Sequence, residues 1–282
     1  MVRCGWHEKN SFYSYISQLS MHVDTIKIGI VIPIYLSKFI KETVSNLLHV
    51  NSRDDLVICV VNDGKDDVKE YLSKHMWPSN VDIVNLPENK CFAGANNAGW
   101  KHLVQNYPNI EYLGSINDDV IARAGWIDNI IEALEKYPKT ALGMPIMETN
   151  QGFFRTKKNF ATWKLKGSDE MVPTAYKIKE DTFVSAVNGF CFVVKKDPLL
   201  KAGMLDEQFR NGCEDVDLGI RLLLDGWRMV VCKNAFVYHY GGSSRYVPGT
   251  NTNLDMNHKI LADKWNHNIE KFNNLDAEGF LI

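Results

Sequence analysis

The first half of the chain alternates continuous apolar runs with segments whose apolar positions recur at helical spacing. Residues 28–35 and 56–61 are apolar runs of the kind that forms a strand buried on both faces. Between them, apolar residues recur at helical spacing over 39–48, which predicts a helix that Ser37 can cap. The same patterns then predict helices over 68–74, 93–104 and 126–137 and strands over 81–86 and 112–116. Strands that alternate with helices in this way predict an α/β fold with a mostly parallel central sheet flanked by helices.

The pattern changes after residue 145. Residues 148–181 are polar, partly basic and rich in aromatic side chains, which indicates a long surface segment of a kind that is usually functional in a compact domain. Ordered patterns then return as strands over 183–194 and 229–232, a helix over 215–224 that Gly226 ends, and an amphipathic helix over 256–272. We therefore predict an extension over 1–26, one α/β domain over 27–244 and a helical tail over 245–282.

Composition narrows the partners that this domain can have. The 282 residues carry 32 Lys+Arg against 34 Asp+Glu, and a net charge of −2 argues against a nucleic-acid partner because phosphate contacts need a basic surface. The six cysteines are scattered without a CxxC pair, so neither a disulfide framework nor a zinc site is predicted. The longest apolar run, Ile28–Leu36, is too short to span a bilayer. We expect a cytoplasmic protein without a transmembrane segment, with contact to a membrane surface left open.

An acidic pair, Asp118 and Asp119, follows the predicted strand 112–116. In open α/β sheets, ligands bind beyond the carboxyl ends of the strands. Adjacent carboxylates repel each other unless a cation or hydrogen bonds offset the repulsion. Hard oxygen ligands on a short loop suit Mg²⁺ or Mn²⁺, which in turn bind a diphosphate. The alternative is a solvated turn that caps the next helix.

Three further segments carry candidate chemistry. Glu214-Asp215-Val216-Asp217 opens a predicted helix, where a carboxylate either caps the helix or stays ionised as a general base. His239 follows a predicted strand and precedes a glycine pair, where it either completes a metal site or is an ordinary polar residue. Residues 89–99 are rich in small side chains but match neither a dinucleotide fingerprint nor a phosphate loop. They serve close helix–strand packing or the close approach of a ligand.

The order of these motifs is more specific than any one of them. Along the chain they read Ile30-Val-Ile-Pro33-Ile-Tyr35, Val61-Asn-Asp63-Gly64, Asn89-x-x-Phe92-Ala93-Gly94-Ala95-x-Asn97, Asn117-Asp-Asp119-Val120, Asn188-Gly189-Phe190, Glu214-Asp215-x-Asp217-Leu218-x-x-Arg221, and His239 before Gly-Gly-Ser. In this order they resemble the family 2 glycosyltransferases, whose GT-A fold is a Rossmann-like α/β architecture, and look most like the rhamnosyltransferase-type branch. The resemblance covers roughly residues 27–244.

The resemblance implies an inverting enzyme that uses Mn²⁺ or Mg²⁺ and moves a sugar from a UDP- or dTDP-sugar donor to an acceptor hydroxyl. The acceptor would be a glycan, a lipid-linked sugar or another hydroxyl compound, within glycan or polysaccharide synthesis. The matching positions imply that Pro33, Tyr35 and Asp63 bind the nucleoside, that Asn97, Asn117, Asp118 and Gly189 contact the rest of the donor, that Asp119 and His239 bind the metal, and that Asp215 is the general base. Asn188, Gly189 and Phe190 would line the sugar and acceptor pocket.

The chain departs from the family pattern on the nucleotide side. Asn62 and Lys65 stand where relatives usually have aspartate and serine, and Asn117 stands where many have the first aspartate of a DxD motif. A metal would therefore rely on Asp119, His239 and the diphosphate itself. The segment 148–181 would be an acceptor-side wall or a lid, in which Trp163 or Phe160 could stack on a sugar ring. The alternative function is a non-catalytic GT-A-like module that binds a nucleotide or a glycan.

Overall fold

The computed structural model of the chain describes residues 23–35, 39–51, 53–149, 152–154, 180–240 and 254–265. Its strands are β1 (Ile28–Ile34), β2 (Leu56–Asn62), β3 (Val81–Asn85), β4 (Tyr112–Ile116), β5 (Val120–Ala122), β6 (Thr140–Thr149), β7 (Gly152–Phe154), β8 (Thr182–Val184), β9 (Cys191–Lys195) and β10 (Arg228–His239). Its helices are the short 3₁₀ helix η1 (Val23–Thr25), α2 (Ile40–Val50), α3 (Asp66–Ser73), α4 (Cys91–Asn106), α5 (Trp126–Lys136), α7 (Lys196–Lys201), α8 (Glu214–Leu224) and α9 (Leu254–Trp265).

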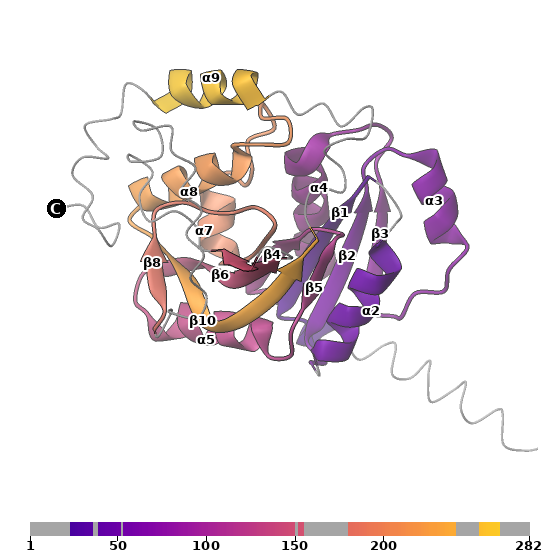
Figure 1. The fold of residues 1–282 in the computed structure, drawn as a ribbon. Helices are drawn as coiled ribbons and strands as arrows, with labels where there is room; N and C mark the ends of the chain where they lie inside the picture. Colours follow the sequence, from indigo (N-terminus) through magenta and orange to yellow (C-terminus); the bar gives the residue numbers. More distant parts are fainter. Residues whose placement is uncertain are drawn as a thin grey trace, which may run out of the picture.

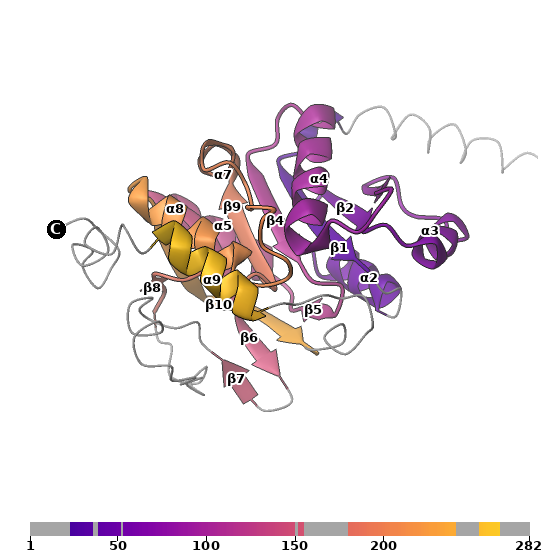
Figure 2. The ribbon, with the colours of Figure 1, turned by 90° about the horizontal axis from the view of Figure 1, so that it is seen from above.

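The strands of the described residues form one sheet with helices on both faces (Figures 1 and 2). The strand order is β3-β2-β1-β4-β9-β6-β10-β5, with β7 added to β6 and β8 added to β10. β1 pairs in parallel with β2 and β4, and β6 pairs in parallel with β10, whereas β9 lies antiparallel between β4 and β6. Every residue of β2 is buried, as a strand covered on both faces requires. The predicted α/β fold with a mostly parallel, helix-flanked sheet is confirmed.

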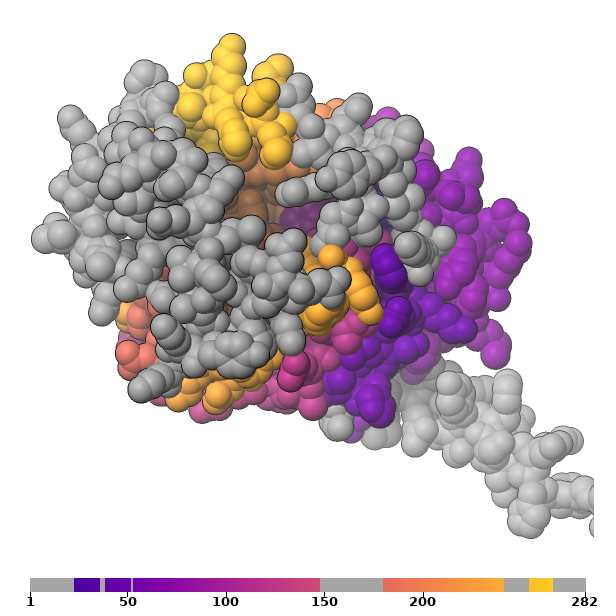
Figure 3. Space-filling model, in the orientation of Figure 1, coloured from indigo at the N-terminus to yellow at the C-terminus, as the bar shows by residue number. Residues whose placement is uncertain are grey.

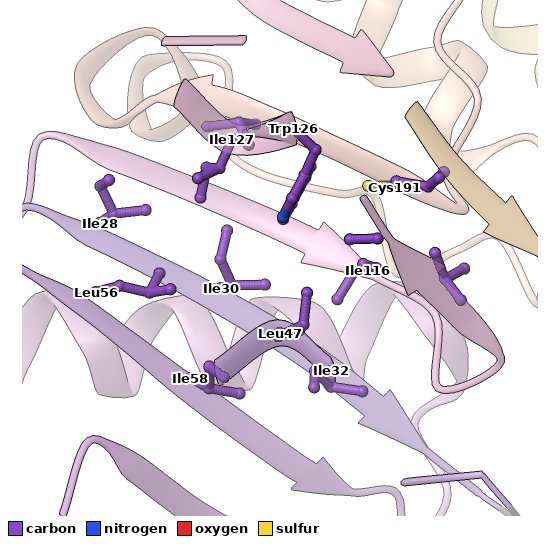
Figure 4. Packing of buried hydrophobic residues seen from close by; sticks show 14 of the residues in the cluster. Ile28, Ile30, Ile32, Leu47, Leu56, Ile58, Ile116, Trp126, Ile127 and Cys191 are labelled. Atoms are coloured by element: carbon purple, nitrogen blue, oxygen red, sulfur yellow. The ribbon is translucent and has the colours of Figure 1, made fainter. Parts of the chain in front are cut away.

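Two apolar cores lie on the two faces of the sheet. Ile28, Ile30 and Ile32 of β1 pack under α2, α3 and α5 (Figure 4), whereas Val31 faces the core formed with α4, α7 and α8. This alternation follows from the period of a strand, in which successive side chains point to opposite faces. Each isoleucine removed from water in this way contributes about 1.5–3 kcal/mol. The two cores hold the strands in position, and they thereby also position the loops that follow the strand ends.

The small residues at the start of α4 serve close packing against the sheet. A Cβ on Gly99 would lie 2.7 Å from Cγ2 of Val31 and 2.9 Å from Cγ2 of Val61, so only glycine lets the helix approach β1 and β2 this closely. Ala93 and Ala95 are buried in the same interface. Of the two interpretations of residues 89–99, the structure therefore supports helix–strand packing.

The sequence pattern misplaced elements in the second half of the chain. The strand predicted over 183–194 is two strands, β8 and β9, because the chain leaves the sheet between them. β6 was not predicted, since its Gly143 and Pro145 are residue types depleted in strands. β10 extends well beyond the predicted 229–232, and its pairing with β6 shifts register between Val231 and Phe236. The polar residues at that irregularity hid the continuation of the strand.

Parts of the predicted extension, surface segment and tail fall outside the described residues, as do Ser37, Trp163 and Phe160. Within the described part, α9 packs on α8 through an apolar cluster of Phe209, Cys213, Ile220, Leu261 and Trp265. The cysteines resolved there are buried free thiols. Across the same residues, no helix combines the length and the apolar character that crossing a bilayer would need.

Candidate active site

The predicted site residues gather at the edge of the sheet where β1, β2, β4 and β10 end. Tyr35 follows β1, Asp63 follows β2, Asp118 and Asp119 connect β4 to β5, and His239 is the last residue of β10. β9 is antiparallel to both β4 and β6, and β6 is parallel to β10, so β4 and β10 point the same way. Residues far apart in the sequence therefore meet at one edge, where ligands of open α/β sheets bind.

Asp119 and His239 contact each other directly. His239 Nε2 lies 3.1 Å from Asp119 Oδ1, with side-chain exposures of 16% and 5%. The contact is fixed by the sheet, because His239 pairs with Val120 and the backbone N–H of Tyr240 donates to the Asp119 carbonyl over 3.0 Å. The ring of Phe190 stacks on the imidazole at a centroid distance of 5.1 Å. A nitrogen and an oxygen ligand are thus held together at a partly open position.

Asp118 lies next to Asp119, in surroundings that disfavour the ionised form of its carboxyl group. Thr43 Oγ1 on α2 donates to the Asp118 backbone carbonyl over 2.6 Å. Burial and the neighbouring charge of Asp119 raise the pKa of the Asp118 carboxyl to about 8. Both causes disfavour a second negative charge unless a cation is close. The adjacent carboxyl groups of Asp118 and Asp119 therefore have the electrostatic character of a cation site.

The donor set suits a divalent ion that shares its coordination with a substrate. Within the described ranges, no three His, Cys, Asp or Glu side chains converge on one point, so the protein alone does not provide a closed metal cage. Asp119 and His239 are two side chains that could bind such an ion. Mg²⁺ and related ions are commonly held by one or two carboxylates, waters and substrate phosphates instead of an all-protein cage. The residues present fit that arrangement.

Asp215 lies in the first turn of α8 and is half-buried. Its Oδ2 accepts the backbone N–H of Gly189 over 2.7 Å, and its Oδ1 accepts the N–H of Val216 over 2.8 Å. Burial raises the pKa of the carboxyl, while these two N–H groups oppose that shift. The N-cap position of α8 is Cys213, without a side-chain cap. Asp215 is therefore not the N-cap of its helix.

The other carboxylates of this motif are not available to a substrate. Glu214 is 5% exposed and accepts the N–H of Gly212 over 2.6 Å. Burial and the charge of Asp215 raise the pKa of Glu214 to about 7. Asp217 is fully buried and pairs with Arg221 on the same helix. Of the three acids, only Asp215 combines a hydrogen-bonded carboxylate with partial access to solvent.

On the nucleotide side, Asp63 is buried at the end of β2. Its Oδ1 accepts the backbone N–H of Lys90 over 2.6 Å, and burial raises the pKa of the carboxyl to about 6. The Lys65 ammonium lies 4.6 Å from the ring centroid of Tyr35. Asn62 donates to the Lys65 carbonyl and accepts the Lys65 N–H, so it stabilises the turn between them. The two departures from the family pattern, Asn62 and Lys65, thus lie in one hydrogen-bonded turn.

We predict that Asp63→Asn stabilises the fold at neutral pH. The Asp63 pKa of about 6 lies above its ordinary 3.8, so the folded state binds this proton more tightly than the unfolded chain does. Protonated Asp63 therefore stabilises the folded state below about pH 4, and this contribution is lost as the pH rises through about 6. The resulting decrease in the free energy of unfolding is ~3 kcal/mol. Asparagine keeps the acceptor for Lys90 and cannot ionise. Urea unfolding should show a gain at pH ~7.5 that disappears at pH ~4, and an equal gain at both pH values would contradict the prediction.

Asn97, a predicted donor contact, forms hydrogen bonds within the protein. Asn97 is 3% exposed, and its amide nitrogen donates to the Leu205 carbonyl and to Glu207 Oε1. Its Oδ1 accepts the Leu205 N–H over 3.0 Å. The amide is therefore occupied within the protein, and Asn97 joins α4 to the loop before α8. Its partners lie far along the chain, so sequence spacing could not reveal this role.

Sequence reasoning missed an aromatic pair at the same edge. Phe39 stacks on Tyr240 at 5.1 Å with an interplanar angle of 6°, and Tyr238 meets Tyr240 edge-on. Tyr240 is 42% exposed. In Figure 3 the end of β10, in orange, adjoins the indigo surface of α2. The signal was present as aromatic residues on both sides of His239, but their partner Phe39, which precedes α2, became apparent only in the fold.

This mostly parallel sheet with helices on both faces is the fold of the GT-A glycosyltransferases. The structure is similar to that of GalNAc-T7 with UDP, GalNAc and Mn²⁺ (TM-score 0.65, 13% identity, 87% of this chain and 49% of that one). It is also similar to a mannosyltransferase from Pyrobaculum calidifontis in complex with GDP-Man and Mn²⁺ (TM-score 0.56, 14% identity, 83% of this chain and 68% of that one). At such identities the likeness concerns the fold.

The family follows from the sequence comparison. The model of glycosyl transferase family 2 matches residues 29–199, more than half of the chain, and the chain belongs to this family. It is 27% identical over 142 residues to the N-acetylglucosaminyl-diphospho-decaprenol L-rhamnosyltransferase of Mycobacterium tuberculosis, in strains CDC 1551 and H37Rv. The match covers 45% of this chain and 46% of the relative, so the chain spans about half the length of these relatives. The predicted family resemblance is confirmed.

Proposed function

We propose that the protein is a metal-dependent, inverting glycosyltransferase that moves a rhamnosyl or related hexosyl group from a UDP- or dTDP-sugar to the hydroxyl of a lipid-linked sugar. One observation carries the proposal. The neighbouring residues Gly189 and Phe190 contact both halves of the site: the Gly189 N–H donates to Asp215, and the Phe190 ring stacks on His239. A proton acceptor and an Asp–His pair suited to a cation are therefore attached to one short segment, as transfer between a donor and an acceptor requires.

The chemistry assigned to Asp215 is proton removal from the acceptor. The acceptor oxygen forms a bond to the anomeric carbon as the bond from that carbon to the diphosphate oxygen breaks. The hydroxyl proton passes to the Asp215 carboxylate, and a single displacement inverts the anomeric centre. The N–H groups of Gly189 and Val216 hold the two carboxylate oxygens in a defined orientation. No acid is needed for the leaving group, because a diphosphate departs as a stable anion.

The donor is assigned to the edge formed by β1, β2 and β4. Pro33, Tyr35 and Asp63 would contact the nucleoside, and Asn117 and Asp118 would lie beside the diphosphate. A divalent ion, Mn²⁺ or Mg²⁺, held by Asp119 and His239 would stabilise the charge that develops on the departing diphosphate. The Mn²⁺ named with both similar solved structures supports this part of the proposal.

The acceptor is inferred from the matched relatives. Their name specifies transfer of L-rhamnose to N-acetylglucosaminyl-diphospho-decaprenol, an acceptor with a polyprenyl chain. We propose an acceptor of the same chemical class, a sugar linked through a diphosphate to a lipid. Such an acceptor would bring the protein to a membrane surface while its reacting sugar enters the site. A glycan without a lipid is the acceptor that the experiment must distinguish from it.

The test is nucleoside-diphosphate release from a panel of dTDP-L-rhamnose, UDP-glucose, UDP-N-acetylgalactosamine and GDP-mannose. Each donor is incubated with Mn²⁺ or Mg²⁺ and a synthetic N-acetylglucosaminyl-diphospho-lipid, then again with a chelator. We expect release from dTDP-L-rhamnose or a UDP-sugar that requires the lipid acceptor and stops with chelator. Release with a free glycan only would correct the acceptor. Metal-dependent binding of a donor without turnover on any acceptor would favour the non-catalytic binding module.

A further inference from the structure

The C-terminal helix α9 lies against α8, the helix that carries Asp215 (Figures 1 and 2). Their apolar contact is a separate small core made by Phe209, Cys213, Ile220, Leu261 and Trp265. The polar contacts of α9 are confined to a smaller region than this apolar packing. They fall on the loop that leads into α8 and on the first turn of α8, where Asp215 is located.

The first contact is a pair of hydrogen bonds from Asn257 to the backbone of Arg210. Asn257 is 2% exposed; its Nδ2 donates to the Arg210 carbonyl over 2.9 Å, and its Oδ1 accepts the Arg210 N–H over 3.1 Å. Both backbone groups of one loop residue are therefore satisfied by a single side chain of α9. The Asn257 side chain is buried and both of its polar ends bond to this residue, so it holds the chain in place just before α8.

The turn that Asn257 holds has an unfavourable backbone conformation. Asn211, Gly212 and Cys213 have φ values of 54°, 153° and 75°. Non-glycine residues rarely adopt positive φ, and such conformations persist only where the surroundings enforce them. On one side, the Phe92 N–H of α4 donates to Asn211 Oδ1 over 2.9 Å. On the other side, Leu254 of α9 lies against Gly212, with its Cδ2 2.9 Å from the position of a Cβ.

The second contact reaches the first turn of α8 itself. Asp217 is fully buried; its Oδ1 accepts a hydrogen bond from Trp265 Nε1 over 2.9 Å and forms an ion pair with Lys264 Nζ at 2.8 Å. Its Oδ2 accepts from Arg221 Nε over 2.8 Å. A buried carboxylate of this kind is held by all of its partners together. α9 thus holds the chain on both sides of Asp215.

We propose that α9 is a positioning element for Asp215, with Asn257 as its principal positioning residue. The inference rests on the proposed function, in which Asp215 accepts the proton. α9 holds the turn 210–213 and Asp217, which together place the first turn of α8 and keep the Asp215 carboxylate on the Gly189 N–H. A displacement of about 1 Å at a reacting group can cost ~10²-fold in rate. Loosening the turn should therefore reduce turnover, because it displaces the carboxylate that accepts the proton.

The test compares Asn257→Ala with Tyr137→Phe. The control removes a hydrogen bond from the Tyr137 hydroxyl to Asp181 Oδ2, 3.0 Å long, near the start of β6 and away from the site edge. With dTDP-L-rhamnose and the synthetic N-acetylglucosaminyl-diphospho-lipid, Asn257→Ala should lower kcat about tenfold or more, a larger factor than its effect on the donor KM. Tyr137→Phe should leave both constants within about twofold of wild type. If Asn257→Ala does not fold, Trp265→Phe replaces it, because phenylalanine retains an aromatic side chain and lacks the N–H that donates to Asp217.

A second readout does not need turnover. The Gly189 amide proton is protected by the Asp215 carboxylate, so its hydrogen exchange reports whether that carboxylate stays in place. We expect faster exchange at Gly189 in Asn257→Ala and no change in Tyr137→Phe. Wild-type exchange at Gly189 together with wild-type kcat would overturn the proposal, whatever the change in Tm. Faster exchange in a protein whose wild type transfers no sugar would refute the proposed function and leave the positioning role intact.

Discussion

Asp215→Asn is expected to lower kcat for sugar transfer about 10²–10⁴-fold, the range in which a positioned general base contributes. Asparagine cannot take the acceptor proton. It also offers a single oxygen where the two carboxylate oxygens now accept the N–H groups of Gly189 and Val216. The donor contacts are on other elements, so the Kd for the nucleoside diphosphate should stay within about threefold. Steady-state kinetics and calorimetric binding on the same preparation measure both quantities.

Glu214→Gln is the matched control for this change. It makes the same carboxylate-to-amide substitution at the adjacent residue, whose side chain is 5% exposed and out of reach of an acceptor. Because burial and Asp215 raise the Glu214 pKa to about 7, this group is only partly ionised near neutral pH. We expect a loss of less than about tenfold. A large loss in Glu214→Gln with normal turnover in Asp215→Asn would transfer the role of base to Glu214.

Asp119→Asn is expected to lower transfer about 10²–10³-fold and to raise the Mn²⁺ concentration needed for half-maximal activity. The estimate follows from the several kcal/mol of charge stabilisation that a divalent ion supplies to a leaving diphosphate. Asp119 provides the oxygen of the Asp119–His239 pair, at 3.1 Å from the imidazole nitrogen. In wild type, chelation should abolish turnover and added Mn²⁺ should restore it. A metal titration of both proteins measures the shift.

Asp118→Asn separates this effect from a general loss of negative charge. Burial and Asp119 raise the pKa of Asp118 to about 8, so its neutral form predominates at pH 7 in the metal-free protein. Asparagine resembles that neutral form, and the structural link through the Asp118 carbonyl to Thr43 is kept. The loss should therefore be clearly smaller than for Asp119→Asn. If the two variants lose equal activity and chelator has no effect on wild type, the metal assignment is wrong.

Local patterns predicted the fold where burial dictates the sequence. β4 has the predicted bounds, and β1 and β2 match their apolar runs closely, because strands covered on both faces require nearly continuous apolar residues. β6 and the extension of β10 were missed because Gly143, Pro145, Lys233 and Asn234 interrupt the apolar pattern. Their strand conformation is imposed by neighbouring strands, and pairing of that kind does not appear in a local window.

The site was predictable as a set of motifs but not as a set of contacts. The order of the acidic, glycine and histidine motifs indicated the family, whereas the Asp119–His239 contact joins residues from opposite halves of the chain. Asn97 illustrates what the motifs could not predict, because its amide donates hydrogen bonds to Leu205 and Glu207 in a loop that is distant in the sequence. The sequence did not predict the contact of α9 with the turn before α8, because Asn257 is only one polar residue in an amphipathic pattern.

The short segment of Gly189 and Phe190 has a consequence for how substrate preference can change within this architecture. Because it contacts Asp215 with one residue and His239 with the next, it links the proposed reacting groups without involving β1 and β2, the strands proposed to receive the nucleoside. Substitutions around Asn62, Lys65 or Tyr35 can then alter which donor is recognised without disturbing the groups that carry out transfer. Conversely, a change within the segment would impair turnover of every donor alike. Substitutions that change the donor should thus concentrate at β1 and β2. Substitutions in the connection between β8 and β9 should be poorly tolerated.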